Sequence, residues 1–434
     1  MPSLRSPLVL LGVALAFRAA LGVAFHLPGP LPEDPEWAWA REQGAVAQAL
    51  LRGEGFADPF AAATGPTAWT GPLYPLVLAA VLQLAGGINE TAQVLLAALQ
   101  VILSALVVLP LLSLGRRLER PMAGVVAAWL WALHPVAAPA AVGQTWDATL
   151  AALLLTTALA AAAARPTGRR LVLAGAWFGL AALLKPVTLA ALAPVAVLAA
   201  APSADRAITA RLRSAGLFAA GTLLVLTPWM TRNAVVLGRF APKLNLGLEL
   251  LVGNNEFADG QYWAPFHTSQ SPNELSLYRK LGEAAYGDDC MHRARTWIRE
   301  NPERFRELTA LRARHFWIGT VRPPELLLGS GAPPDWKGLI KWWAYAVMGV
   351  LGLLGALCWR GAAGSRWLVT GVVLTYPLVY LVTHATGRYR LPLEPLLTLT
   401  AVALVLSVGE RLLRRGPGGE APASAGRAPS RGVD

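Results

Sequence analysis

The feature that most constrains this chain is a series of apolar runs too long for the core helices of a soluble protein. Two of them read "LVLLGVALAFRAALGVAF" and "VLLAALQVILSALVVLPLLSL", and a transmembrane helix needs about 20 apolar residues. Only 15% of the 434 residues are charged, against about 25% in average globular chains. The sequence therefore predicts an all-α polytopic membrane protein with about ten transmembrane helices. They are expected near residues 6–27, 91–114, 121–140, 147–164, 170–184, 187–201, 214–230, 338–358, 367–383 and 391–409.

A further apolar segment, Leu76 to Ala85, is too short to span, and it follows the proline-rich stretch "GPTAWTGPLYP". If it does not cross and the N-terminus is cytosolic, four cytosolic loops hold eleven Arg, and three short outer loops hold three Lys or Arg. A crossing would invert this distribution and contradict the positive-inside rule. We therefore predict a juxtamembrane helix that lies on the outer surface or re-enters. Residues 66–75 should then line a site, because polar backbone at that depth is tolerated only beside a protein cavity.

This topology divides the chain into four parts, the first of which begins with a retained signal anchor. The parts are an N-terminal transmembrane module, 1–230, whose outer loop 28–90 carries the juxtamembrane helices; an extracytoplasmic loop region, 231–337; C-terminal transmembrane helices, 338–410; and a cytosolic tail, 411–434. From Gly416 the tail consists largely of Gly, Pro, Ala, Ser and Arg, a composition that predicts disorder.

Two outer stretches are predicted to be helical. Residues 37–51 have small and apolar residues at helical spacing, and Gly53 and Gly55 should end that helix. Residues 290–320 should form two helices that meet at Asn301 and Pro302, as N-cap and first helical residue. The arginines of this second stretch indicate either contact with anionic headgroups or a solvated basic hairpin.

Composition also excludes several classes. The net charge of +12 does not require nucleic acid as a partner, because Lys and Arg gather in the cytosolic loops of membrane proteins. Two cysteines and six histidines without an HExxH motif give no disulfide framework and no dedicated metal site. No cofactor is indicated, and the sequence does not reveal whether a divalent cation assists.

Carboxylates are the first candidates for chemistry. The outer loop contains Asp34 and Glu36 upstream of the predicted helix, and Glu42 lies inside it among small, apolar residues. Asp147 stands at the outer end of a span, in "AVGQTWDATLAALL", where an acid is costly unless it faces a polar cavity. The alternative for each acid is an ordinary solvated group or interface marker.

Cationic candidates are predicted on the same face. They are Lys185, Arg232, Arg388 and Arg390, and Arg in particular suits bidentate phosphate binding. The alternative is a set of anchors whose charged ends reach the headgroups. Trp69 and Tyr74 in the proline-rich stretch, and Asn254 in "LELLVGNN", are expected to line the same cleft.

Carboxylates and phosphate-suited cations on one membrane face, around a helix that does not cross, imply a particular chemistry. A lipid phosphate would keep its isoprenoid chain in the bilayer and its phosphate at the outer interface. A carboxylate would act as general base toward an acceptor hydroxyl or amine. Arg or Lys would stabilise the negative charge that grows on the departing phosphate.

An ordered set of stretches between about residues 37 and 400 resembles the GT-C superfamily of polytopic glycosyltransferases. The similarity is strongest to the bacterial branch akin to dolichyl-phosphate-mannose protein mannosyltransferases and to the lipid A aminoarabinose transferase. The stretches read "AQALLRGEGFADPF", "GPTAWTGPLYPLVLA", "LWALHPVAAPAAVGQTWDATLAALL", "LAALLKPVTL", "TPWMTRNAVVLGRF", "NLGLELLVGNN" and "GRYRLPLEP".

The resemblance implies an inverting transferase in the bacterial inner membrane with an extracytoplasmic active site. Its donor would be a polyprenyl-phosphate-linked sugar, and its acceptor a glycan, lipid or protein. Asp147 occupies the place of the family's second acid. The usual Asp-Glu pair ahead of a Tyr is replaced here by "WAWAREQ", so Glu42, Asp34 and Glu36 all remain candidates for the base.

Two other readings stay open. A transporter or flippase of a lipid-linked substrate would also place charges in the membrane, although such proteins tend to show internal repeats, and none is found here. A non-catalytic relative would account for the missing Asp-Glu register. Neither the sugar nor the acceptor can be read from the sequence.

Overall fold

The structure is a computed structural model that describes residues 5–34, 38–164, 167–199, 208–262, 264–320 and 336–414. The tail from residue 415, which was expected to be disordered, and Glu36 lie outside the described residues. Every regular element within these ranges is a helix, apart from an isolated bridge between Ala57 and Pro66. The predicted all-α fold class is confirmed.

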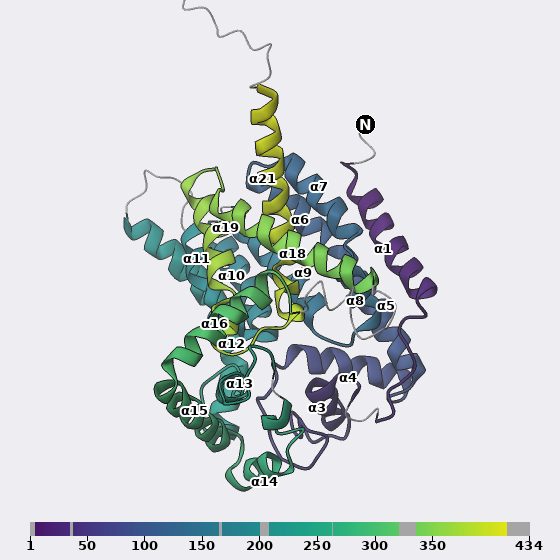
Figure 1. Ribbon diagram of the computed structural model, residues 1–434, viewed down its shortest axis with the longest axis vertical. Coiled ribbons are helices and arrows are strands. Elements are labelled where there is room, and N and C mark those ends of the chain that lie inside the picture. The colour runs from purple at the N-terminus through teal and green to yellow at the C-terminus, as the bar shows by residue number, and fades with distance from the viewer. Residues whose placement is uncertain are drawn as a thin grey trace, which may run out of the picture.

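The helices form two layers, a bundle and a cap beneath it (Figure 1). The bundle contains α1 (Pro7–Ala24), α5 (Glu90–Leu106), α6 (Val108–Arg117), α7 (Pro121–Ala132), α8 (Ala137–Gly143), α9 (Ala148–Ala163), α10 (Arg169–Leu184), η2 (Pro186–Ala191), α11 (Leu192–Ala199), α12 (Ile208–Leu237), α18 (Trp336–Leu357), α19 (Ala363–Thr375), α20 (Leu378–Val382), η4 (Gly387–Leu393) and α21 (Glu394–Arg414). The cap contains α3 (Arg41–Leu51), α4 (Leu73–Ala85), α13 (Leu246–Gly253), η3 (Ala264–Phe266), α14 (Pro272–Leu281), α15 (Glu283–Glu300) and α16 (Pro302–Trp317).

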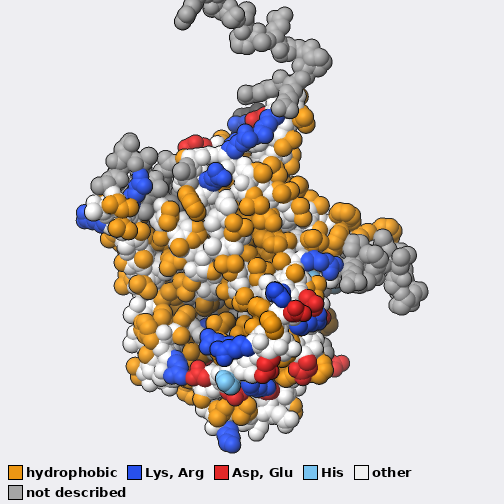
Figure 2. All heavy atoms as spheres, turned by 60° about the vertical axis from the view of Figure 1, so that its left-hand side comes forward, with side chains coloured by type: hydrophobic (Ala, Val, Ile, Leu, Met, Phe, Trp, Pro, Cys, Tyr) orange, Lys and Arg blue, Asp and Glu red, His pale blue; other side chains and the backbone are white. Residues whose placement is uncertain are grey.

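Length and composition identify six helices of the described chain as candidate membrane spans, or seven if α7 and α8 form one bent span. The chain is thus a multi-pass membrane protein, whereas the number of ten spans stays a prediction. Figure 2 shows a broad apolar surface over the bundle, with charged side chains gathered over the cap and a further group of Lys and Arg at the other end. That pattern is typical of a bundle with lipid around its middle.

The segment expected to span the membrane near residues 121–140 consists of two helices. α7 ends at Ala132, α8 begins at Ala137, and the two axes differ by 42°. Pro135 explains the break, because proline donates no backbone hydrogen bond and disfavours helical geometry at the preceding residue, His134. The segment expected at 187–201 likewise begins as the 3₁₀ helix η2 before it becomes α11.

Other expected boundaries agree with the structure. α15 and α16 meet at Asn301, and Pro302 is the first residue of α16, as predicted. Asn301 does not cap α16 with its side chain, however, because its Nδ2 donates to the carbonyl of Trp297. In the outer loop, α3 begins at Arg41 rather than near residue 37, and the chain turns at Gly53, where φ is 79°.

Two arrangements of helices position the site. α9 is the centre of the bundle, with twelve of its sixteen residues buried, and it places its N-terminal end against the cap. α4 has 13 residues, or about 20 Å at 1.5 Å per residue, and it lies across the ends of the bundle helices beside α3 (Figure 1). This is the arrangement expected of a juxtamembrane helix.

Candidate active site

Glu42 lies in the first turn of α3, directly after an unusual turn of the backbone. Ala40 and Arg41 have φ angles of 58° and 48°, in the left-handed region that residues other than glycine rarely adopt. Gly44 allows the turn to close, because a Cβ atom there would come within 2.1 Å of the carbonyl oxygen of Trp39. Strained backbone of this kind costs on the order of 1–3 kcal/mol and tends to occur at functional sites.

A buried histidine faces Glu42. The Nε2 of His267 lies 3.4 Å from the Oε1 of Glu42, and its Nδ1 accepts the backbone N–H of Ser269 at 3.2 Å. Burial lowers the pKa of His267, so the ring is neutral near pH 7. Since Nδ1 is an acceptor, the ring proton of the neutral form resides on Nε2 and points toward the Glu42 carboxylate. The Glu42 carboxyl group therefore lies beside a neutral imidazole.

Asp147 immediately precedes α9 and is 7% exposed. Its Oδ1 accepts from Lys185 Nζ at 2.7 Å, and its Oδ2 accepts from Gln43 Nε2 at 3.2 Å. The second contact links α3 to the start of α9. Because Gln43 follows Glu42 in the chain, this hydrogen bond holds Glu42 close to Asp147. A carboxylate at a helix N-terminus also gains from the helix dipole.

A second acid and histidine also lie beside the Tyr262 ring. Glu249, in α13, has its Oε2 3.6 Å from His384 Nε2 and accepts from Asn245 Nδ2 at 2.5 Å. The Tyr262 ring centroid lies 5.5 Å from that of His267 and 5.4 Å from that of His384. Two carboxylate–histidine pairs are thus held around one aromatic ring.

Two cations complete the site. Lys243 interacts electrostatically with Glu249, Asp147 and Glu42 at once, and burial lowers its pKa. The guanidinium of Arg388 lies 4.3 Å from the Trp146 ring centroid, and its charge acts on Glu42 and Asp147. No hydrogen bond joins Lys243 Nζ to another described residue. Unlike Lys185, which is paired with Asp147, Lys243 and Arg388 keep donors available for an anionic ligand.

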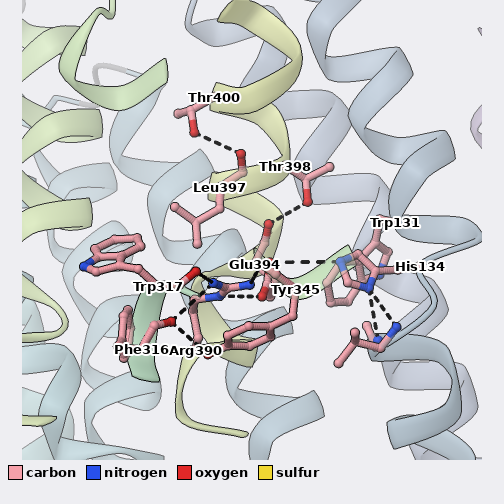
Figure 3. Close-up of polar contacts among 12 residues, drawn as sticks. Trp131, His134, Phe316, Trp317, Tyr345, Arg390, Glu394, Leu397, Thr398 and Thr400 are labelled. Atoms are coloured by element: carbon pink, nitrogen blue, oxygen red, sulfur yellow. Dashed lines mark hydrogen bonds and ion pairs between the residues drawn. The ribbon is translucent and has the colours of Figure 1, made fainter. Parts of the chain in front are cut away.

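Arg390, expected to bind phosphate, lies elsewhere. It is fully buried, and its Nε donates to Glu394 Oε1 at 2.7 Å, while Nη1 donates to the carbonyls of Phe316 and Trp317 (Figure 3). The Tyr345 ring centroid lies 3.3 Å from its guanidinium carbon. Its donors are committed to protein partners, so the structure does not bring Arg390 into the cluster around Glu42.

Arg232 is also absent from the cluster, since it donates to the carbonyls of Thr67 and Phe56 and so holds the outer loop. Asn254 donates to the carbonyls of Leu250 and Val382 and accepts from Arg312, which is a structural arrangement.

The remaining expected residues have different positions. Asp34 lies exposed on the segment before α3. Trp69 and Tyr74 are buried behind the site: the Trp69 ring packs 5.9 Å from that of His267, and Tyr74 donates its hydroxyl to the carbonyl of Thr145, two residues before Asp147. They support site residues from behind.

Sequence reasoning missed Lys243, Glu249, Tyr262, His267 and His384. Glu249 lies in the stretch "NLGLELLVGNN", in which only Asn254 was named as a candidate, and His384 lies three residues before the stretch "GRYRLPLEP". His267 and Lys243 lie in a long loop region with no recognisable motif, and only the fold brings them to α3 and α9. Within the described ranges, no three His, Cys, Asp or Glu side chains are grouped so that they could hold a metal ion.

Comparisons with known proteins bear on the family and the fold. Residues 69–231 match the family described as dolichyl-phosphate-mannose-protein mannosyltransferase, which confirms the resemblance to GT-C membrane glycosyltransferases expected from the sequence. No curated protein matches the chain significantly.

Two solved structures of the oligosaccharyltransferase of Archaeoglobus fulgidus are similar over 96% of this chain. One, tethered with an acceptor peptide, has 14% identity and a TM-score of 0.51, and it shows a shared fold. The other, the enzyme AglB with an inhibitory peptide and a dolichol-phosphate, has 16% identity and a TM-score of 0.49. The chain covers 52% of each of them, about half their length.

Proposed function

We propose that this protein is a glycosyltransferase that moves a sugar from a polyprenyl-phosphate carrier to an acceptor on the extracytoplasmic side of the membrane. The observation that carries the proposal is Glu42, a partly exposed carboxylate beside the neutral His267, with Lys243 and Arg388 close enough to act on it. The match to a dolichyl-phosphate-mannose-protein mannosyltransferase family supports a lipid-phosphate sugar as donor.

In the proposed reaction, Glu42 accepts the proton of the acceptor hydroxyl or amine. The acceptor atom forms a bond to the anomeric carbon as the bond from that carbon to the phosphate oxygen breaks. The electron pair of the broken bond remains on the phosphate, and Lys243 and Arg388 stabilise the added charge. A single displacement of this kind inverts the anomeric centre.

Asp147 and Lys185 have a positioning role in this proposal. Their ion pair and the Gln43 hydrogen bond to Asp147 fix α3 against α9, and thereby set the place of Glu42. Small displacements of a reacting group are costly, because reacting atoms must approach to about 3–3.5 Å. We therefore assign Lys185 to Asp147 rather than to the donor phosphate.

The test uses the whole protein in lipid nanodiscs with a panel of polyprenyl-monophosphate sugars and envelope extract as acceptor. Released polyprenyl phosphate is measured by mass spectrometry. We expect release from one donor, and loss of release in Glu42→Gln. Glu54→Gln is the matched control, because Glu54 lies in the same loop, is exposed and pairs with nearby Arg52.

Two results would contradict the proposal. Release at the wild-type rate in Glu42→Gln would remove Glu42 from the base role. Saturable binding of one donor without release, under conditions in which an acceptor is present, would favour a transporter or a non-catalytic relative.

A further inference from the structure

A pocket lies at the end of the bundle opposite the cap (Figure 1). It encloses about 270 Å³ between the start of α7, the end of α18 and the last turns of α21. Among the side chains that line it are Arg120, Arg360, Arg411, Trp359, Leu404 and Val408. None of them takes part in the site around Glu42.

The three arginines come from three separate parts of the chain. Arg120 precedes α7, Arg360 follows α18, and Arg411 lies near the end of α21. The three residues therefore belong to three different helices but lie at the same end of the bundle. Arg120 Nη2 donates to the carbonyl of Arg360 at 2.7 Å, and its guanidinium lies 6.0 Å from the Trp359 ring centroid. No ion pair with a carboxylate is formed by any of the three within the described part of the chain. The pocket therefore has a positive rim.

Its walls are apolar. Gly355, Ala403, Leu404 and Val408 line the interior. Because an ordered water needs two to four polar partners, this lining suits an apolar occupant better than water. The outer surface beside it is also apolar, with Leu357 45%, Val405 56% and Val408 44% exposed. An apolar interior with a basic rim, beside an apolar outer surface, suits a molecule with an acyl chain and an anionic headgroup.

We propose that this pocket binds an anionic glycerophospholipid, with its phosphate against Arg360 and Arg411 and part of an acyl chain in the pocket. Basic pockets between transmembrane helices bind such headgroups, and a phosphate diester complements this positive rim. The occupant is a lipid of the leaflet opposite the site around Glu42. Polyprenyl phosphate is not the occupant, because its proposed site is at the other end of the bundle.

The structure also predicts an effect of the bound lipid. The pocket is built from α7, α18 and α21, and α21 packs against both of the others. A ligand that contacts all three helices only in the folded state raises the stability of that state by mass action. We therefore expect anionic phospholipid to raise the melting temperature of the purified protein.

The experiment measures retained lipid by native mass spectrometry and melting in nanodiscs of phosphatidylcholine with or without phosphatidylglycerol. We expect wild type to retain phosphatidylglycerol and to melt higher in its presence. Arg360→Gln and Arg411→Gln should each weaken retention about fivefold, as about 1 kcal/mol per basic residue near a membrane surface implies. Ser407→Phe should also weaken it, because Ser407 lines the pocket and the larger side chain would fill it without changing the charge.

Arg366→Gln is the matched control, because Arg366 is exposed in α19 near the same end and does not line the pocket. An equal loss in this control would show a general surface attraction and overturn the proposal. Retention unchanged in Arg360→Gln, Arg411→Gln and Ser407→Phe would overturn it as well. So would retention of polyprenyl phosphate in place of phosphatidylglycerol at this pocket.

Discussion

Arg388 and Arg390 are two residues apart, yet they belong to regions of opposite character. Arg388 is half-buried over the Trp146 ring. It belongs to the charged cluster in which Asp147 accepts hydrogen bonds from Lys185 and Gln43. Arg390 is fully enclosed and is bound to Glu394 and to backbone carbonyls. The 3₁₀ geometry of η4 separates them, because at three residues per turn side chains two positions apart point in different directions.

The difference between the two regions is that the charge of Arg390 stabilises the fold, whereas the charge of Arg388 is available to bind a ligand. A buried ion pair contributes to folding only when its geometry is good and the remaining polar atoms of both partners are hydrogen-bonded. The nitrogen atoms of Arg390 all donate to described partners, whereas Glu394 Oε2 has no hydrogen-bond partner within the described part of the chain. Near Glu394, the Nε2 of His134 lies 4.0 Å from the second carboxylate oxygen, and this group also lies inside the bundle (Figure 3). Around Arg388, by contrast, donors remain available, which is what a binding site for an anion requires.

The largest expected effect is on folding. Arg390→Gln should leave Glu394 buried without its partner, and breaking a buried pair costs about 3–5 kcal/mol. We expect a large fall in melting temperature and in the yield of folded protein in detergent. Arg388→Gln is the matched control and should melt close to wild type. Similar melting temperatures for both variants would contradict the assignment of a structural role to Arg390 alone.

The next effect is on chemistry. Glu42→Gln should lower transfer by about 10²–10⁴-fold, the usual contribution of a general base, with little change in melting because Glu42 is partly exposed. Glu394→Gln, the same substitution in the other region, should lower melting instead. A Glu394 variant that melts normally but does not transfer sugar would place the chemistry around Glu394 and not around Glu42, and would contradict this prediction.

Donor binding should change by a smaller factor. Arg388→Gln and Lys243→Met each remove a charged donor, and hydrogen bonds to charged groups contribute about 1.5–3 kcal/mol. We therefore expect kcat/KM for the lipid donor to fall about 10–100-fold. Lys185→Met is informative beside them: it should lower kcat chiefly, because Lys185 contacts Asp147. An equal change of KM in all three variants would argue against separate roles.

The pH profile tests the histidine. Because burial lowers the pKa of His267, transfer should be full above its ordinary value of about 6.5 and should fall only as pH drops below that. Protonated His267 would pair with Glu42 and make it a weaker base. The same group affects stability: the unfolded histidine takes up its proton at a higher pH, so stability is complete above about 6.5 and decreases below it.

His267→Gln should shift or abolish this acid limb while transfer at pH 8 stays within about tenfold of wild type. The measurement is kcat/KM against pH for both proteins. An unchanged acid limb in His267→Gln would assign it to another group.

The smallest effect concerns sidedness and should leave activity unchanged. Glu90 is exposed at the start of α5, directly after the turn that follows α4, whereas Cys358 is exposed at the opposite end and Cys290 is buried. In intact cells, an impermeant maleimide should label Glu90→Cys and leave Cys358 unlabelled. Labelling of Cys358 alone would show that the topology is the opposite of the one predicted here.

The parts of this account that local sequence could predict are those set by local physics. Apolar length identified the helical membrane fold, and Asn301 and Pro302 marked a helix boundary. The position of α4 outside the spans, which rests on charge counts, stays a prediction. The sequence also named Glu42, Asp147, Lys185 and Arg388, because a charged residue beside a membrane span is costly unless it faces a polar cavity. The structure places these four residues in one cluster.

The rest depends on tertiary structure. His267 reaches Glu42 across more than two hundred residues, and Lys243 carries no local motif. Arg390 could not be told from Arg388, because both are arginines in one short turn and only the packing of Tyr345 and Glu394 separates them. The break at Pro135 could have been read from the proline, but its place within an apolar run concealed it.

One measurement tests the central claim, that the cluster around Glu42 binds the lipid phosphate. A polyprenyl phosphate with a photoreactive group near the phosphate would be crosslinked to the protein in nanodiscs and the labelled peptides identified by mass spectrometry. We predict labelling within residues 239–250 and 383–390, reduced in Arg388→Gln and unchanged in Arg366→Gln. Labelling confined to other segments, or equal labelling in Arg388→Gln and wild type, would contradict the account.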